Sequence, residues 1–495
     1  MAYLESNLGN RLGLLVESEK YNYKKLLEAT AEELRSEKRK SDKLLLQLTT
    51  NAETGLPNSV VLHRELDALL ETDTVPKAVI FVALNENFGM LKRTFSTKIP
   101  EWILYQTSLR LQKIVGTSGR IYHTHEDEFL VLMDRSNLGQ DLEDFAKNLV
   151  EIIEKSHVMA GYTISLGVHL GIALYPEHGK KKATLLRHAD IALSEAGKEK
   201  TSFRIFSPEL KDSIVERVEL QNGILLALES QANMDEKPQF ELFFHPQVQI
   251  EKTPSGTWTG RIIGAETLIR WKHPTLGFIP PAKFIPVAEE TGLIIPLGHW
   301  IFHTAISYIQ DLARLKIKDM PLSVNFSSLQ FNNDDVSHMI HDVVQRRGIP
   351  PSLLKIEITE SGLMRDYTTT IEKMKGLRQE GFKILVDDFG TGYSSLSYLK
   401  ELPIDVVKVD KSFIDHVTHD ASDQALTRAI VTLAKDLNLG VIVEGTETRG
   451  QIEWLYEIGC DTFQGYYFSK PLPYNDFLNF LKDFPQILQE KLSVV

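Results

Sequence analysis

Apolar runs of β-strand length alternate with helical segments from Gln239 to about residue 490, and this alternation constrains the fold more than any other feature of the chain. The apolar runs are 240–248, 262–271, 322–326, 354–358, 383–386, 406–409, 441–443 and 463–468. Alternation of this kind over about 250 residues predicts a TIM-like (β/α)8 barrel. The sequence leaves open whether the first strand runs against the others.

The first 50 residues predict a long helix, because they contain no proline and are dense in Leu, Glu and Lys. Several leucines follow three-, four- and seven-residue steps, namely Leu4, Leu8, Leu12, Leu15, Leu27 and Leu34. Such a stripe needs a partner, so we expect a coiled coil or a clamp on the next domain.

Residues 51–206 predict an α+β sheet domain. The expected strands are 77–84, 120–125, 128–133, 163–174 and 203–206, and the expected helices lie near 100–116, 139–155 and 182–197. A helical linker then covers 207–237, between Pro208 and Pro238, because proline is tolerated at a helix start but not in its interior. The barrel domain would take residues 238–490.

Acidic and amide side chains stand at the ends of the barrel's apolar runs, where chemistry sits in such folds. These residues are Glu266, Asn325, Glu357, Asp387, Asp388, Asp410 and Glu444, with Lys408 near the end of its run and Gln464 at the start of the last run. Carboxylates gathered at one mouth repel one another unless cations compensate them. Oxygen ligands favour Mg²⁺ or Mn²⁺ over zinc. Taken alone, Asp387 and Asp388 also fit an acidic turn after a core strand.

The barrel region resembles the EAL domain, the family of cyclic di-GMP phosphodiesterases, over essentially its whole length. The matching segments are Gly264-Ala265-Glu266, Ile269-Arg270-Trp271, 324–327, 357–360, 387–396, 407–410, Glu444-Gly445 and 464–466. Each motif alone is weak, but all of them in order at strand ends are specific.

The resemblance implies a role for each site residue. The metal ligands would be Glu266, Asn325, Glu357, Asp387, Asp388 and Glu444, holding two Mg²⁺ or Mn²⁺ ions bridged by Asp387. The residues with catalytic roles would be Glu266, Asp387, Lys408, which orients the nucleophile, and Glu360, which braces the loop 389–394. The residues on the substrate side would be Arg270, as a phosphate contact, with His245, Asp410 and Gln464.

Two positions depart from the EAL pattern. Thr267 stands where the family has alanine, but it alternates away from the face that Glu266 serves, so activity should survive. His245 replaces a glutamine that resembles a substrate contact, so affinity for the dinucleotide could change. A solvated histidine without a role is an equal alternative.

The domain at 51–206 resembles the GGDEF, or diguanylate cyclase, domain through Thr54 to Asn58, 127–129, 172–176 and 188–192. Its chemistry departs from the family. His125-Glu126 replaces Gly-Gly, and two large side chains would obstruct the close approach of backbone to a nucleotide. The run 82–88 carries no aspartate for Mg²⁺, and the inhibitory Arg-x-x-Asp site would fall on Gly116 and Gly119. We expect an inactive, regulatory domain; retained GTP sensing is a disfavoured alternative.

Bulk properties restrict the partners. A formal net charge of −12 argues against a general nucleic-acid or anionic-membrane surface. One cysteine, Cys460, suits a reducing compartment, and the apolar runs are too short to span a bilayer. Residues 1–20 lack a signal-peptide core. We therefore expect a soluble, cytoplasmic protein.

The leading hypothesis is a metal-dependent phosphodiesterase that converts cyclic di-GMP to linear pGpG. It would form a homodimer through the EAL domain and the N-terminal helix, and a protein signalling partner is allowed. The alternative is a non-catalytic cyclic di-GMP receptor that signals to a protein partner. A third reading, a pure interaction platform, conflicts with the presence of Arg270.

Overall fold

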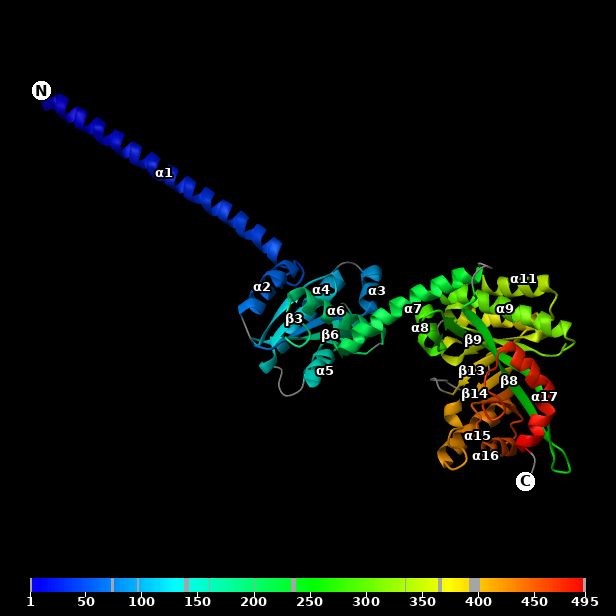
Figure 1. The fold of residues 1–495 in the computed structure, drawn as a ribbon. Coiled ribbons are helices and arrows are strands. Elements are labelled where there is room, and N and C mark those ends of the chain that lie inside the picture. The colour runs from blue at the N-terminus through cyan, green and yellow to red at the C-terminus, as the bar shows by residue number, and fades with distance from the viewer. Residues whose placement is uncertain are drawn as a thin grey trace. The chain divides into compact units, whose positions relative to one another are not determined.

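The computed structural model describes residues 2–72, 75–95, 98–137, 142–159, 161–199, 201–232, 237–333, 335–363, 367–390 and 401–492. The chain folds into two compact units, Met1–Val215 and Glu216–Val495 (Figure 1). The division falls within the helix α7 (Pro208–Ala232), which occupies most of the predicted linker. No helix in the described ranges combines the length and the apolar character that crossing a bilayer requires.

The first unit is built on a sheet in which the described strands follow the order β2-β3-β1-β6-β7. Its strands are β1 (Lys77–Leu84), β2 (Gly119–His123), β3 (Glu128–Asp134), β6 (Val168–Tyr175) and β7 (Phe203–Ile205). A separate ribbon pairs β4 (His157–Met159) with β5 (Tyr162–Ile164). The pairs β1–β3, β1–β6 and β2–β3 are antiparallel, whereas β6–β7 is parallel.

The single strand expected over 163–174 is wrong, because these residues divide between two sheets: β5 belongs to the separate ribbon and β6 to the five-stranded sheet. Gly167 accepts a hydrogen bond from the backbone N–H of Asn85 at 3.0 Å. A Cβ at Gly167 would lie 2.6 Å from Asn85 Nδ2, so a larger residue there would require the Asn85 side chain to move. The contact lies between β5 and β6, and the chain joins the five-stranded sheet only at Val168, where β6 begins.

Helices cover both faces of this sheet, as the alternation of β1 requires. Ala78, Ile80 and Val82 share one core with α3 (Glu86–Thr94), α4 (Lys98–Val115) and α5 (Leu142–Ile153). Val79 points to the other core, with α2 (Ser59–Thr72) and α6 (Lys182–Lys198). The predicted α+β domain is confirmed.

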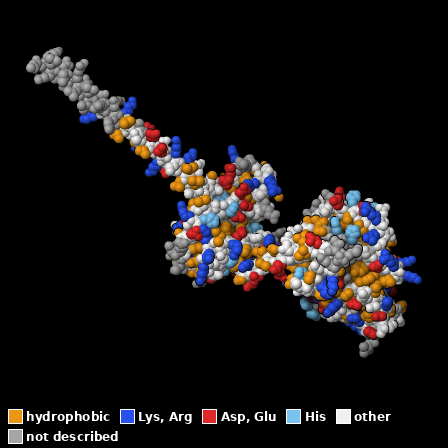
Figure 2. Space-filling model, turned by 45° about the horizontal axis from the view of Figure 1, so that its top comes forward, with side chains coloured by type: hydrophobic (Ala, Val, Ile, Leu, Met, Phe, Trp, Pro, Cys, Tyr) orange, Lys and Arg blue, Asp and Glu red, His pale blue; other side chains and the backbone are white. Residues whose placement is uncertain are grey.

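The N-terminal segment forms one helix, α1 (Ala2–Thr49), as predicted. Its described side chains include exposed leucines: Leu27 is 65% and Leu34 is 62% exposed. Figure 2 shows hydrophobic side chains among charged ones on the described part of this helix. The side chains of Leu4, Leu8, Leu12 and Leu15 lie outside the described ones.

The second unit is a closed barrel. Its strands are β8 (Phe240–Lys252), β9 (Trp258–His273), β11 (Leu322–Phe326), β12 (Leu354–Thr359), β13 (Lys383–Phe389), β14 (Val406–Val409), β15 (Gly440–Glu444) and β16 (Thr462–Gln464). Among described residues, these strands follow the order β9-β11-β12-β13-β14-β15-β16-β8. Because β8 also pairs with β9, the sheet closes into a barrel. A short strand, β10 (Gly277–Ile279), extends β9. The predicted (β/α)8 barrel is confirmed.

The first barrel strand runs against its neighbours, which settles the direction that the sequence left open. β8 is antiparallel to both β9 and β16, whereas the pairs from β9 through β16 are parallel. The last strand is shorter than the expected run 463–468. A Cβ at Gly465 would lie 2.3 Å from Thr446 N, so the chain turns there to pass close to Thr446.

Amphipathic helices surround the barrel and fill its outer core (Figure 1). The longer ones are α8 (Pro281–Glu290), α9 (Ile294–Arg314), α11 (Val336–Arg347), α13 (Tyr367–Gln379), α15 (Ala421–Asp436), α16 (Arg449–Glu457) and α17 (Tyr474–Leu492). Because the parallel strands share one direction, their carboxyl ends meet at one mouth.

Candidate active site at the barrel mouth

Lys408 of β14 lies at the centre of a group of acidic side chains at this mouth. Its Nζ lies 2.7 Å from Glu357 Oε2, 2.7 Å from Glu444 Oε1, 3.1 Å from Asp387 Oδ1 and 3.2 Å from Glu266 Oε2. The four carboxylates come from four different strands, and the Lys408 side chain is fully buried. The structure therefore brings together the residues that the strand ends predicted. We call Glu266, Glu357, Asp387, Asp388 and Glu444 the carboxylate cluster.

Asp387 and Asp388 are adjacent in a strand, yet both belong to the cluster. The pairing of β13 with β14 shifts register between Val386 and Phe389, and Asp388 has φ 52°, in the left-handed region. A non-glycine residue in that region costs on the order of 1 kcal/mol or more. The bulge breaks the strict alternation of a strand, so that oxygens of Asp387 and Asp388 lie within 4.8 Å of each other and of an oxygen of Glu444.

Glu266 is held by contacts to both of its carboxylate oxygens. Asn325 Nδ2 donates to Oε1 at 2.6 Å, while Gln464 Nε2 donates to Oε2 at 2.5 Å and Lys408 approaches the same oxygen. The residue is 4% exposed. These contacts fix the orientation of Glu266, the first of the predicted metal ligands along the chain.

Burial and mutual repulsion divide the cluster into two kinds of carboxyl. Burial, together with Glu266 and Asp387, raises the pKa of Glu357 to about 7, and burial raises that of Glu444 well above its usual range. Burial also acts on Glu266, but Lys408 and the hydrogen bonds from Gln464 and Asn325 outweigh it and lower the pKa. Burial opposes the charge of Lys408, and the surrounding carboxylates overcome it and raise its pKa.

The donor set fits divalent metal. The Lys408 ammonium pairs with four of the cluster's five carboxylates, so negative charge exceeds positive charge within this described group. Among the described residues, Glu357 Oε1 is buried without a hydrogen-bond partner, which is costly for a charged oxygen. Two groups of three carboxylates have ligand oxygens within 4.8 Å of one another, and Asp387 belongs to both. Oxygen donors of this kind suit Mg²⁺, Mn²⁺ or Ca²⁺.

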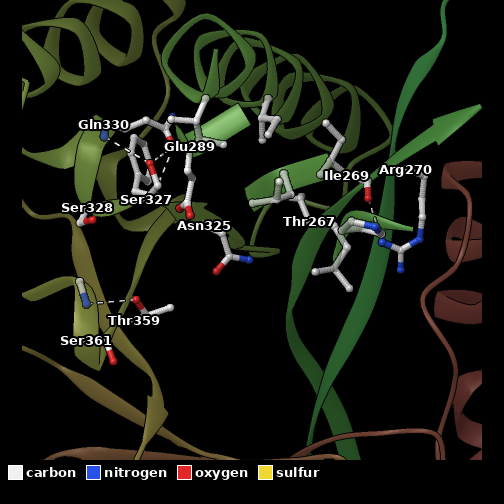
Figure 3. A pocket seen from close by; sticks show the side chains of 17 residues that line it. Thr267, Ile269, Arg270, Glu289, Asn325, Ser327, Ser328, Gln330, Thr359 and Ser361 are labelled. Carbon is white, nitrogen blue, oxygen red and sulfur yellow. Dashed lines mark hydrogen bonds between the residues drawn. The ribbon is translucent and has the colours of Figure 1, made fainter. Parts of the chain in front are cut away.

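A cavity of about 410 Å³ adjoins the cluster and contains Arg270. Figure 3 shows Arg270 and Thr267 on one side, Thr359 and Ser361 on the other, and Asn325 between them. Arg270 Nη1 donates to the Ile269 carbonyl at 2.9 Å, and its guanidinium lies 5.3 Å from the centre of the Phe243 ring. Burial lowers the pKa of Arg270. A guanidinium in an open cavity beside carboxylates is a suitable contact for phosphate.

The remaining residues predicted on the substrate side, His245, Gln464 and Asp410, all make hydrogen bonds within the protein. His245 is 8% exposed, and its Nε2 lies 3.1 Å from the Ser469 carbonyl, so the alternative of a solvated histidine is wrong. Burial lowers its pKa to about 4. Gln464 is buried, and its amide donates inside the carboxylate cluster. Asp410 follows β14 and accepts from Ser412 N at 3.0 Å. Their contacts with substrate stay predictions.

Glu360 follows β12 and reaches the next strand. Its Oε2 accepts a hydrogen bond from the backbone N–H of Gly390 at 2.7 Å. Most of the loop that it was expected to brace, from residue 391 onward, lies outside the described residues.

The first unit has a cavity of about 530 Å³ where the resemblance placed a nucleotide. His125 and Glu126 line it, together with Lys92, Glu53 and Glu101. The Lys92 ammonium lies 2.5 Å from Glu126 Oε2. This pairing was not expected from the sequence, because Lys92 lies 34 residues away.

Sequence reasoning also missed Gln247 and Lys355, which lie inside the barrel next to the site. Gln247 is fully buried, and Lys355 Nζ donates to its Oε1 at 2.8 Å. A signal existed, because Gln247 lies two residues after His245 and Lys355 two residues before Glu357. Strand alternation therefore directs them to the same side as those residues.

The chain matches two known families in succession. Residues 49–202 match the diguanylate cyclase, GGDEF domain, and residues 228–471 match the EAL domain. The bifunctional diguanylate cyclase/cyclic di-GMP phosphodiesterase MucR of Pseudomonas aeruginosa is 31% identical, over 91% of this chain and 64% of its own length. Cyclic di-GMP phosphodiesterase PdeR of Escherichia coli is also 31% identical, over 89% of this chain and 64% of its own length.

The folds of both units also occur in a solved structure. The Vibrio cholerae LapD S helix-GGDEF-EAL structure, bound to c-di-GMP, matches 88% of this chain and 99% of its own with a TM-score of 0.52. At 16% sequence identity this likeness concerns the fold alone. The chain spans between 53% and 64% of the length of the first curated relatives it matches.

Proposed function

Because the chain belongs to the family of proteins in which a GGDEF domain is followed by an EAL domain, we propose that its barrel hydrolyses cyclic di-GMP to linear pGpG. The observation that carries this proposal is the carboxylate cluster around Lys408, beside the cavity that contains Arg270. One part of the mouth can hold cations and activate water, and the other can hold phosphate. The relatives MucR and PdeR, which are named as cyclic di-GMP phosphodiesterases, support the choice of substrate.

The proposed cofactor is Mg²⁺ or Mn²⁺, with two ions in the EAL domain. The residues that would hold them are Glu266, Asn325, Glu357, Asp387, Asp388 and Glu444. Divalent cations bound there would lower the pKa of water and withdraw charge from the phosphate oxygens. Asp387 would be shared, since it belongs to both groups of three carboxylates.

The chain's own residues would orient the reactants. Arg270 would hold a phosphate through its guanidinium, close to the mouth of the barrel. Lys408, kept protonated by its carboxylates, would orient the attacking water and balance developing negative charge. In the reaction, water oxygen forms a bond to phosphorus, the bond from phosphorus to one ribose oxygen breaks, and that oxygen takes up a proton.

The proposal assigns regulation to the GGDEF domain, without cyclase activity. The Lys92–Glu126 ion pair and His125 occupy the cavity where glycines would leave room for a nucleotide. Glu53, Glu101 and Glu126 also make the lining unfavourable to a triphosphate. A homodimer through the EAL domain and α1 belongs to the proposal, supported by the exposed leucines of α1.

Turnover of cyclic di-GMP by the full chain, with Mg²⁺ or Mn²⁺, tests the proposal. We expect pGpG in either metal, and loss of product by at least 100-fold in Glu266→Gln, which removes a charged ligand. Glu380→Gln is the matched control, because Glu380 is paired with His341 on the barrel surface at 2.8 Å. Its activity should equal that of the wild type.

Binding of cyclic di-GMP without turnover in either metal would overturn the proposed enzymatic activity and favour the alternative of a non-catalytic receptor. GTP tests the other domain: no cyclic di-GMP should form, and detectable product would contradict an inactive GGDEF domain.

A further inference from the structure

Three polar side chains form a continuous row inside the barrel, next to the carboxylate cluster. They are Lys355 of β12, Gln247 of β8 and Gln464 of β16, which we call the Lys–Gln–Gln row. Lys355 Nζ donates to Gln247 Oε1 at 2.8 Å, and Gln247 Nε2 donates to Gln464 Oε1 at 3.1 Å. Both glutamines are buried, with exposures of 0% and 3%.

The row ends on two residues of the cluster. Gln464 Nε2 donates to Glu266 Oε2 at 2.5 Å and to Glu444 Oε1 at 3.3 Å. A connected line of hydrogen bonds thus joins the ammonium of Lys355, through two amides, to two carboxylates. Among the described residues, none of these three side chains lines the cavity that contains Arg270.

The chemistry at the two ends determines which way both amides point. An ammonium can only donate, so Gln247 must offer its oxygen to Lys355 and its N–H₂ to Gln464. An ionised carboxylate can only accept, so Gln464 must offer its N–H₂ to Glu266 and Glu444. The two requirements agree along the row. Reversing either amide would place two acceptors or two donors face to face.

We propose that Lys355 and Gln247 are positioning residues for the metal site, an inference that rests on the proposed metal-dependent function. They hold the amide of Gln464 with its donors toward Glu266 and Glu444, and so fix these carboxylates before a cation binds. Gly264 leaves room for the row, since a Cβ there would lie 3.0 Å from Lys355 Nζ and 3.2 Å from Gln247 Oε1.

Without Lys355 the direction of the row is no longer imposed from that end. Gln247 can then turn its amide, and Gln464 keeps its donors toward Glu266 and Glu444 only through those carboxylates, so its amide is held less firmly. Substituting a residue that hydrogen-bonds to a metal ligand typically lowers metal affinity or activity about 10–100-fold. The row should therefore influence how tightly the site binds a divalent cation, without touching substrate.

Calorimetric titration of the full chain with Mn²⁺ alone tests the proposal. Gln247→Leu and Lys355→Met should each weaken Mn²⁺ binding about 10-fold. The double variant should bind Mn²⁺ about as tightly as each single variant, because both substitutions interrupt one row. Gln249→Leu is the matched control: the residue lies on the same strand, but its Nε2 donates to Asp461 Oδ2 at 2.9 Å, and its affinity for Mn²⁺ should be unchanged.

Turnover adds a readout that a general loss of packing would not give. High Mn²⁺ should restore most of the activity of Gln247→Leu and Lys355→Met, because the substrate contacts are intact. If Gln247→Leu does not fold, Gln247→Asn replaces it; its amide is one methylene too short to reach both neighbours, and it should also weaken Mn²⁺ binding.

Two outcomes separate this inference from the proposed function. If the folded variants of the row bind Mn²⁺ as tightly as the wild type does, the inference is overturned and the proposed function stands. Wild-type protein that binds no Mn²⁺ overturns the metal-dependent function, and the inference with it.

Discussion

The carboxylate of Glu360 accepts a hydrogen bond from the backbone N–H of Gly390 at 2.7 Å. Glu360 begins the short helix α12 (Glu360–Leu363) directly after β12, and Gly390 directly follows β13. The contact therefore joins the ends of two neighbouring strands that also carry Glu357 and Asp387. Gly390 has φ 98°, and a Cβ there would lie 2.9 Å from the Phe413 ring, so the backbone at this point suits only glycine.

Replacing Glu360 with alanine should lower turnover about 10- to 100-fold, because the start of the loop after β13 loses its acceptor. Glu360→Gln can still accept through its amide oxygen and should lose less. Hydrolysis rates at saturating Mn²⁺ measure both effects. Equal turnover in wild type and Glu360→Ala would contradict a bracing role for Glu360.

Lys408→Met should destabilise the barrel in the absence of metal, because four neighbouring carboxylates lose their compensating charge. Breaking a buried ion pair in this way costs roughly 3–5 kcal/mol. Saturating Mn²⁺ should recover part of the loss by supplying positive charge, while turnover stays at least 100-fold reduced. Urea unfolding with EDTA and with Mn²⁺ measures the difference.

Lys373→Met provides the comparison for Lys408→Met. Lys373 is partly buried in the same barrel, but its Nζ donates to the carbonyls of Phe331, Asn332 and Asn333. Its loss should lower stability equally with and without Mn²⁺. A Lys408→Met protein that shows no metal-dependent recovery would contradict the charge argument.

His245→Gln should lower the KM for cyclic di-GMP severalfold and leave kcat within about twofold. His245 is neutral at pH 7, since burial lowers its pKa to about 4, and it is already bonded to the Ser469 carbonyl. A glutamine can keep that bond through its N–H₂ and offer its oxygen to a ligand. An unchanged KM would show that position 245 does not contact substrate.

Local patterns were sufficient to predict the elements that carry the site. The strands β1, β11 and β14 have the predicted bounds, because each is a short, mainly apolar run that a polar residue follows directly. Glu357 and Glu444 both contact Lys408 because parallel strands of a barrel end at one mouth, a property of the fold class and not of any single residue.

What escaped prediction depends on contacts between distant segments. The left-handed φ of Asp388 follows from the register shift of β13 against β14, which has no local sequence signature. The break before β6 arises where Gly167 meets Asn85, and the contact of Gln247 with Lys355 joins residues 108 apart. Side-chain networks of this kind become visible only when the barrel is closed.

His157 should make the first unit less stable as the pH falls. The residue is 3% exposed, its ring packs edge-on against Trp102 at 5.9 Å, and its Nε2 accepts from Arg110 Nη1 at 3.1 Å. Burial, together with Arg110, lowers its pKa to about 4. The folded state thus resists a proton that the unfolded state takes up near pH 6.5.

Because the folded pKa is the lower one, the stabilising contribution is complete above about pH 6.5 and is lost progressively as the pH falls toward 4. Between pH 7 and pH 5 this amounts to about 2 kcal/mol of unfolding free energy. Urea unfolding of wild type and His157→Leu at both pH values measures it, since the variant should lack this part of the decline. His63→Leu, at an exposed position of α2, should follow the wild type. If His157→Leu loses as much stability as the wild type between the two pH values, His157 is not the group responsible.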